Sequence, residues 1–303
     1  MTCSSYLASS SMSLEGAIGV LLTVSKSVSR LSLALVVLLV TEVVFPNYFW
    51  SRQIQSSKNK FQNVRHEVLH SIATLIGGKF IQYLFQVGIA NQVIVLVVLN
   101  HNEEDTNQNT DTSATNLAPL HFWLRLLAEV SVYFVVFDAY FYIFHRLFHT
   151  RYLWFIHKSH HVSSTPNAIA GFSFNPMEGN FFGSFLPLYS MVLTYLFGGV
   201  LKSTLVGCGT LQLTQSLLIH SGYELVGSSH FENRFLSLFL TPTFHDRHHE
   251  CPNCNFSGFF TWLDDLFGTA DKDWRRKYSS WRRTNNRQEY AQGRGKVADK
   301  KTS

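Results

Sequence analysis

The chain has 303 residues, of which only 15% are Asp, Glu, Lys or Arg, whereas 46% are hydrophobic and 15% are aromatic. Soluble domains carry about 25% charged residues, so this composition excludes a disordered or collagen-like chain and favours a membrane protein with a polar face. The net charge of +5 comes from the tail that starts at Lys272, with 11 Lys or Arg against 3 Asp or Glu, and does not indicate nucleic-acid binding.

Several apolar stretches approach the ~20 residues that a membrane-spanning helix needs. In chain order they are residues 31–50, 81–99, 122–144, 181–200 and 204–219. The last two are separated by only three residues and predict a helical hairpin. No strand-like alternation stands out, so the sequence predicts a mostly α polytopic membrane protein with about four to five transmembrane helices. No basic segment precedes the apolar run near the N-terminus, and no signal peptide is predicted.

The charges between the stretches predict their orientation. Residues 102–116 are acidic and contain no Lys or Arg, whereas residues 51–65 contain four basic residues. The positive-inside rule places the first segment in the lumen and the second in the cytoplasm. His145 and His220, which directly follow the third and fifth stretches, are then expected on the cytoplasmic face.

Histidines near these ends recur at helical spacing. His145-Arg-Leu-Phe-His149 puts two imidazoles one helical turn apart, and the HxxHH pattern then occurs twice, with His220 between the two copies. The nine candidate metal ligands are His145, His149, His157, His160, His161, His220, His245, His248 and His249.

So many imidazoles cannot be buried together without hydrogen-bond or metal partners. One tetrahedral zinc takes about four ligands, so nine indicate two metals, and an imidazole-rich site suits iron or another redox metal better than structural zinc. The sequence therefore predicts a cytoplasmic, histidine-rich dimetal cap. No nucleotide-binding or haem-attachment motif is present, so electrons are expected from another protein.

In their order and spacing, the three histidine motifs resemble those of the membrane fatty acid hydroxylase/sterol desaturase superfamily. His220-Ser-Gly-Tyr223 and the Asn-Cys-Asn-Phe segment ending at Phe256 are most similar to its sterol branch, that is, to cholesterol 25-hydroxylases and 4-methylsterol oxidases. The segment Asn175-Pro-Met-Glu178 stands where members carry His-Pro-x-Glu. The resemblance predicts N-terminal membrane segments and a lumenal loop in residues 1–121, a catalytic domain in 122–269 and a basic cytoplasmic tail in 270–303.

The resemblance implies a di-iron centre that uses O2 to hydroxylate or otherwise oxidise a C–H bond of a lipid, with electrons from NAD(P)H through cytochrome b5 and its reductase or a similar donor. A sterol is the expected substrate, and a sphingolipid or fatty acid is the alternative. Hydroxylation, desaturation and multi-step oxidation all stay open. Asp138 and Asp246 are predicted to orient imidazoles, and Glu224 is the candidate tenth ligand. Lys300 and Lys301, near the C-terminus, resemble a retrieval signal and predict the endoplasmic reticulum membrane.

Two other classes of protein fit parts of the sequence. His66-Glu67-Val-Leu-His70 matches the HExxH helix of zinc metalloproteases, in which the glutamate is the general base, and predicts an intramembrane protease instead. A metal carrier or scaffold would use the histidines without catalysis, but its ligands are expected near the middle of the bilayer. Cys251 and Cys254 form a single CxxC pair, for which packing beside the last histidine motif is the simplest interpretation.

Overall fold

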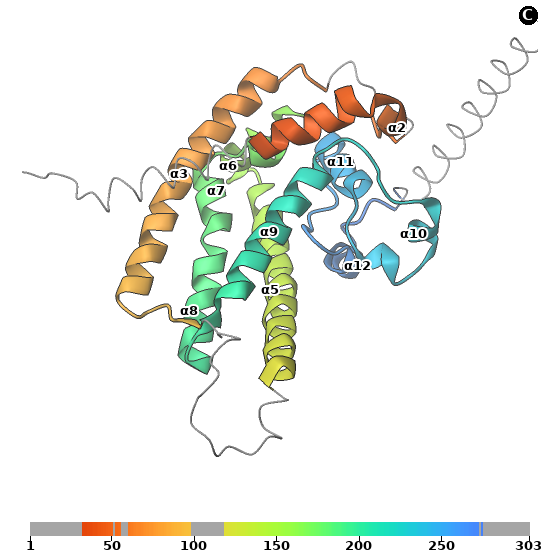
Figure 1. Cartoon of the computed structure of the whole chain (residues 1–303). Coiled ribbons are helices and arrows are strands. Elements are labelled where there is room, and N and C mark those ends of the chain that lie inside the picture. Colours follow the sequence, from red (N-terminus) through yellow and green to blue (C-terminus); the bar gives the residue numbers. More distant parts are fainter. Residues whose placement is uncertain (1–31, 51, 56–59, 98–117, 273, 275–303) are drawn as a thin grey trace, which may run out of the picture.

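The computed structural model describes residues 32–50, 52–55, 60–97, 118–272 and 274. This part of the chain is mostly helical, as predicted (Figure 1). Its long helices are α3 (Val64–Ala90), α5 (Ala118–Phe148), α8 (Phe185–Phe197) and α9 (Lys202–Ile219). The shorter helices are α2 (Pro46–Trp50), α6 (Trp154–His157), α7 (Pro176–Gly183), α10 (Ser228–Glu232), α11 (Pro242–Glu250) and α12 (Trp262–Phe267). The π- and 3-10 turns are η1 (Val40–Val44), η3 (His160–Val162), η4 (Ala170–Phe172) and η5 (Leu236–Leu238).

Three helical segments of the described part are long and apolar enough to cross a membrane. They are α3, Leu120–Phe148 within α5, and Pro176–Phe197, which joins α7 to α8. A polytopic helical membrane protein is therefore confirmed, with three candidate spans where the sequence predicted four to five. Large apolar side chains of α3, such as Ile76, Phe80 and Tyr83, are exposed, which suits a helix that faces lipid.

Two of the predicted spans have different bounds in the structure. Within the described residues, the apolar helix Ser32–Val44 is shorter than a membrane span; its last turn is π-helical and Pro46 starts the separate helix α2. This segment lies across one end of the bundle (Figure 1). The second predicted span, residues 81–99, is replaced by α3, which ends at Ala90 because Gln92 turns the chain with a φ of 58°. The predicted hairpin is present: residues 198–201 connect α8 to α9.

An aromatic core holds α5, α8 and α9 together. It includes Tyr133, Phe137, Phe185, Tyr189 and Cys208, all less than 10% exposed. At the end of α5 that is remote from His145, Glu129 accepts hydrogen bonds from the Thr204 hydroxyl (2.5 Å) and the Leu201 amide (3.1 Å) and pairs with Arg125 (2.7 Å). Strand β2 (Val200–Leu201) pairs there in parallel with β1 (Leu96–Val97).

At the opposite end, the C-termini of α5 and α9 meet the N-termini of α3 and α7. The short elements α6, η3 and α11 cover this end. All the histidine motifs are located in these segments, so the fold brings them to one end of the bundle.

Candidate dimetal site

The nine predicted histidines form two groups of nitrogen atoms. Within each group the ligand atoms all lie within 4.8 Å of one another. The first group consists of His145, His149, His157, His161 and His248, and is called the five-histidine group. The second consists of His160, His220, His245 and His249, and is called the four-histidine group. Two neighbouring centres are thus assembled from residues that lie up to 104 positions apart in the chain.

Each HxxHH motif contributes to both groups. His157 and His161 belong to the five-histidine group, whereas His160 belongs to the other; conversely, His245 and His249 enclose His248, which belongs to the five-histidine group. The three imidazoles of one motif therefore do not all face the same centre. Residues at i and i+4 stay together, while the residue at i+3 lies about 100° of helical rotation from i+4 and faces the neighbouring group.

In six of the nine rings, an outer hydrogen bond determines which nitrogen carries the proton. The Nδ1–H of His145 donates to the carbonyl of Phe256 (2.6 Å), that of His248 to Cys254 (2.6 Å), and that of His220 to Ser216 (2.8 Å). The Nδ1 atoms of His249 and His160 likewise face the carbonyls of Ser163 (3.0 Å) and Ser173 (3.4 Å). A carbonyl can only accept, so Nδ1 must hold the proton and Nε2 is left with a free lone pair.

His157 has a carboxylate in place of a carbonyl. Its Nδ1 lies 2.6 Å from Oε1 of Glu178, and both side chains are fully buried. Glu178 is held in the first turn of α7, where Pro176 starts the helix and the Asn175 side chain caps it through the Met177 amide (2.9 Å). Sequence reasoning did not assign this role to Glu178, although the Asn-Pro-Met-Glu segment was a visible signal.

The inward nitrogens fit metal ions. The Nε2 atoms of His145 and His157 lie 3.0 Å apart, and those of His220 and His160 lie 3.2 Å apart. Nε2 of His149 and Nε2 of His248 are buried and have no hydrogen-bond partner. Two lone pairs facing each other repel, whereas about 3 Å is a normal separation for two nitrogens that each lie about 2.1 Å from one ion. The donor set therefore suits a cation in each group.

Burial keeps these rings neutral, as ligation requires. Desolvation, reinforced by the neighbouring imidazoles, lowers the pKa of the buried histidines well below 6.5; these are His157, His160, His161, His245, His248 and His249. Burial likewise lowers the pKa of His149, and that of His220 to about 4. The lone pairs are thus available to a metal at neutral pH.

A loop after the third motif supplies two of the outer acceptors. The carboxylate of Asp264 accepts from the amides of Phe256 (2.9 Å) and Ser257 (2.8 Å) and orders the loop. Asp138 accepts from the amides of Gly258 (3.1 Å) and Phe259 (2.8 Å). Asp138 therefore anchors the loop to α5, instead of accepting from an imidazole as predicted.

The other predicted carboxylates also have structural partners. Asp246 accepts from the amide group of Gln55 (2.7 Å) and forms no hydrogen bond with an imidazole of the described residues. Glu224 accepts from the amides of Val226 (3.2 Å) and Thr243 (3.1 Å) and thereby caps the helix α11. It belongs to neither histidine group, so the prediction of a tenth ligand is corrected.

Cys251 and Cys254, the residues of the CxxC pair, are free thiols. Neither cysteine belongs to a metal-binding group of the described residues. The thiol of Cys254 contacts the carbonyl of Cys251 (3.3 Å), and burial raises its pKa to about 12. These contacts agree with ordinary packing beside the third motif.

The HExxH residues do not form a protease site in the described structure. His66 and His70 stack on α3 with ring centroids 4.1 Å apart, but neither belongs to a group of three or more described ligands. The carboxylate of Glu67 is buried and accepts from Ser163 (2.5 Å) and Asn167 (2.6 Å), so it is not free to act on a zinc-bound water.

Comparisons with known proteins identify the segment that carries the site. Residues 130–269 match the family model described as fatty acid hydroxylase. The chain is 34% identical over 161 residues to a very-long-chain aldehyde decarbonylase of Oryza sativa, an alignment that covers 52% of this chain and 57% of the relative. It is 32% identical over 162 residues to methylsterol monooxygenase 2-2 of Arabidopsis thaliana, covering 52% and 58%. It is 30% identical over 146 residues to C-4 methylsterol oxidase of Schizosaccharomyces pombe, covering 48% of each.

The chain thus spans about half the length of the curated relatives it matches. No solved structure matches it.

Proposed function

We propose that the chain is a di-iron membrane oxygenase that oxidises an unactivated C–H bond of a sterol, because residues 130–269 match the fatty acid hydroxylase model and the chain is similar to a methylsterol monooxygenase and a methylsterol oxidase. The observation that carries the proposal is the convergence of nine imidazoles in two groups, where the inward nitrogens face one another and those of His149 and His248 have no hydrogen-bond partner among the described residues. Five neutral nitrogens in one group exceed the four ligands of structural zinc and suit a redox metal.

The reaction consumes O2, two electrons and two protons for each C–H bond that becomes C–OH, and releases one water. A bound iron pair supplies the activation of O2 that no amino-acid side chain can provide. The nine imidazoles would hold the irons, and being neutral they leave the net positive charge of the centre to the metals. Glu178 and the carbonyls of Phe256, Cys254 and Ser216 hold the rings in one tautomer.

The surrounding chain controls what reaches the site. Aromatic side chains of α5 and α7 enclose His145: Phe141 lies 4.8 Å from its ring, and Phe182 lies 4.6 Å from Phe141, between centroids. These rings exclude water from the side that faces the bundle, which suits an apolar substrate arriving from the bilayer.

The proposal includes an electron donor and a cellular location for the protein. The sequence offers no nucleotide-binding motif, so NAD(P)H would act through cytochrome b5 and its reductase or a similar donor. Such a donor works in the cytoplasm, so the histidine end of the bundle would face it in the endoplasmic reticulum membrane. Lys300 and Lys301 support that location in the sequence and lie outside the described residues.

The test measures both the iron content of the protein and the product of its reaction. Purified protein is expected to contain about two irons per chain and, with a reductant and 18O2, to place one labelled oxygen in a sterol recovered from membranes. His248→Ala should abolish the product because it removes a ligand, whereas Leu196→Ala, an exposed change at the remote end of α8, should not. Stoichiometric zinc without iron would contradict the proposal.

A second substrate class follows from one relative. The Oryza sativa protein is described as acting on very-long-chain aldehydes, so a long-chain lipid is the alternative to a sterol, as is a sphingolipid or a fatty acid. Mass spectrometry of lipids from cells with and without the protein separates these classes. Loss of an aldehyde or acyl lipid with unchanged sterols would favour the alternative.

A further inference from the structure

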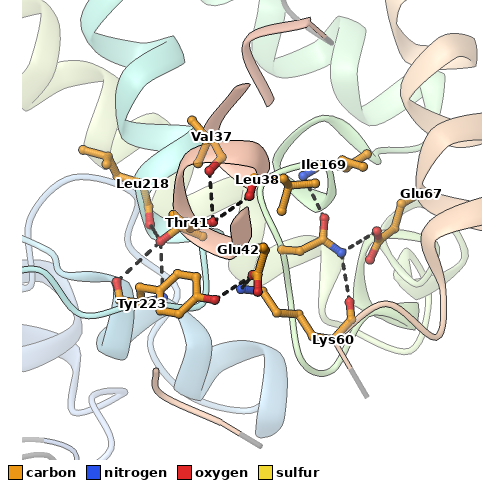
Figure 2. A network of polar contacts seen from close by, with 11 residues as sticks. Val37, Leu38, Thr41, Glu42, Lys60, Glu67, Ile169, Leu218 and Tyr223 are labelled. Atoms are coloured by element: carbon orange, nitrogen blue, oxygen red, sulfur yellow. Dashed lines mark hydrogen bonds and ion pairs between the residues drawn. The ribbon is translucent and has the colours of Figure 1, made fainter. Parts of the chain in front are cut away.

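The two histidine groups differ in what lies behind their outer acceptors. These acceptors all lie within residues 130–269; they are Phe256, Cys254 and Glu178 for the five-histidine group and Ser216, Ser163 and Ser173 for the four-histidine group. Behind the four-histidine group, further contacts lead to residues 42–67, outside the matched domain. This N-terminal support consists of two arms that meet at Lys60 (Figure 2).

Lys60 is the centre of the N-terminal support. Its side chain is only 2% exposed, and its amine forms an ion pair with Glu42 at 2.7 Å. The amine also lies 3.7 Å from the centroid of the Tyr223 ring, a cation–π distance. An ammonium this deeply buried needs such partners, because an unpaired buried charge is strongly unfavourable.

The first arm leads to His220. The hydroxyl of Tyr223 donates to Glu42 at 2.6 Å, so the ion pair fixes the residue three positions after the ligand (Figure 2). Gly222 has a φ of 79°, and a Cβ at this position would lie 3.3 Å from Cε of Lys60. The loop after His220 therefore has the conformation and the small residue that Lys60 requires. The amide of Ile54 adds a backbone hydrogen bond to the carbonyl of Gly222 (3.0 Å).

The second arm leads to His249. The side-chain amide of Asn167 donates to the carbonyl of Lys60 (3.0 Å) and to Glu67 (2.6 Å). Glu67 in turn accepts from the hydroxyl of Ser163 (2.5 Å), whose carbonyl accepts the Nδ1–H of His249 (3.0 Å). Glu67, the glutamate of the HExxH motif, thus supports a histidine ligand through Ser163.

We propose that this N-terminal support positions the metal of the four-histidine group selectively, with Glu42, Lys60 and Tyr223 as positioning residues. The inference rests on the proposed function, because it requires a metal in each group. Loss of the Glu42–Lys60 pair would release the loop of His220 and loosen the four-histidine group, while the five-histidine group keeps all of its outer acceptors.

The experiment measures release of ferrous iron to a coloured chelator, without oxygen, from the full-length protein loaded with iron alone. The wild-type protein is expected to release its two irons slowly. Glu42→Gln and Tyr223→Phe are expected to release one iron about 10-fold or more faster and the other at the wild-type rate. After removal of the fast iron and oxidation, the remaining ion should give the paramagnetic resonance signal of an isolated ferric ion.

The matched control is Glu129→Gln, which breaks the ion pair of the buried Glu129 side chain with Arg125 (2.7 Å) in the other half of α5. Glu129 precedes His145 by 16 residues, about 24 Å along the helix. This change should lower the unfolding temperature and leave both irons slow to release. Lys60→Arg keeps the charge and should restore slow release relative to Lys60→Met.

Each outcome of these measurements either supports or overturns the inference. Two slow irons in both Glu42→Gln and Tyr223→Phe, or equal acceleration of both irons, would overturn the selective support. Tyr223→Phe removes one oxygen and keeps the ring over Lys60, so it tests the inference even where Glu42→Gln fails to fold. A wild-type protein that never binds two irons would instead overturn the proposed function, and this inference with it.

Discussion

At the scale of single residues, the outer hydrogen bonds determine which nitrogen is available to a metal in six of the nine imidazoles. A histidine can bind a metal through either ring nitrogen, and the partner of one nitrogen fixes the role of the other. Carbonyls of Phe256, Cys254 and Ser216 do this for three rings, and a carboxylate does it for His157. Glu178 therefore differs from the other acceptors because it adds a charge.

Glu178→Gln is expected to weaken metal binding by about 10- to 100-fold, because it replaces a charge-assisted hydrogen bond to His157 by a neutral one. The measurement is the metal content of purified protein at rising chelator concentration. Met177→Ala, at the neighbouring exposed position, should match the wild type. Equal metal affinity in Glu178→Gln and wild type would show that the carboxylate does not support the site.

At the scale of elements, the site depends on how closely the segments approach each other. The turn η4 packs on α9 at Gly171, whose carbonyl accepts from the Ser216 hydroxyl (2.9 Å). A Cβ at Gly171 would lie 2.9 Å from that hydroxyl and 3.3 Å from Nδ1 of His220. The absence of a side chain thus lets α9 present His220 to the four-histidine group.

Gly171→Ala should therefore destabilise the fold by about 1–3 kcal/mol through overpacking and lower the metal content, since the new methyl crowds His220. Thermal unfolding and metal analysis of the same preparation check both effects. Gly207→Ala is the control: a Cβ there meets no atom within 4 Å, and alanine favours helix α9 by about 0.5–1 kcal/mol. A Gly171→Ala protein as stable and as metal-rich as Gly207→Ala would refute the close-approach argument.

At the scale of the whole molecule, four helix ends and three short elements converge on one buried cluster of neutral imidazoles. A free histidine binds a proton as the pH falls through about 6.5, whereas these buried rings have to stay neutral in the metal-free protein. Metal ions provide the missing partners, so metal binding and folding are expected to be coupled.

Metal-free protein should consequently lose stability as the pH falls below about 6.5. Burial lowers the pKa of eight histidines outside the spans, so the unfolded chain binds more protons than the native one in this range. The eight are His149, His157, His160, His161, His220, His245, His248 and His249. Each ring that stays neutral costs about 1.4 kcal/mol per pH unit.

Asp246 and Glu224 oppose this trend. Burial raises the pKa of both carboxyls, that of Asp246 to about 7, so the native state gains protons there as the pH falls. The eight histidines outweigh the two carboxyls. Circular dichroism should therefore show an unfolding temperature that is nearly constant above pH 7 and falls steeply between pH 6.5 and 5. A constant unfolding temperature from pH 7.5 to 5 would contradict this balance.

The sequence by itself determined the class of the fold and the nine histidines. Apolar stretches of spanning length predict a helical membrane protein because lipid leaves the backbone few other options, and the i, i+3, i+4 spacing predicts which imidazoles can converge. The same motifs carried the resemblance to the fatty acid hydroxylase family, whose model matches residues 130–269. These features are encoded locally, over one or two helical turns.

Only the tertiary structure decided how the histidines divide into two groups and which residues support them. His160 and His248 each leave their own motif for the neighbouring group. Glu178, Lys60 and Glu67 are close in space, but not in sequence, to the rings or loops that they hold. Asp138 and Glu224 were predicted as site residues, but in the structure Asp138 holds the loop at Phe259 and Glu224 caps helix α11. A buried carboxylate takes whichever donor the packing brings to it, and spacing along the chain does not contain that information.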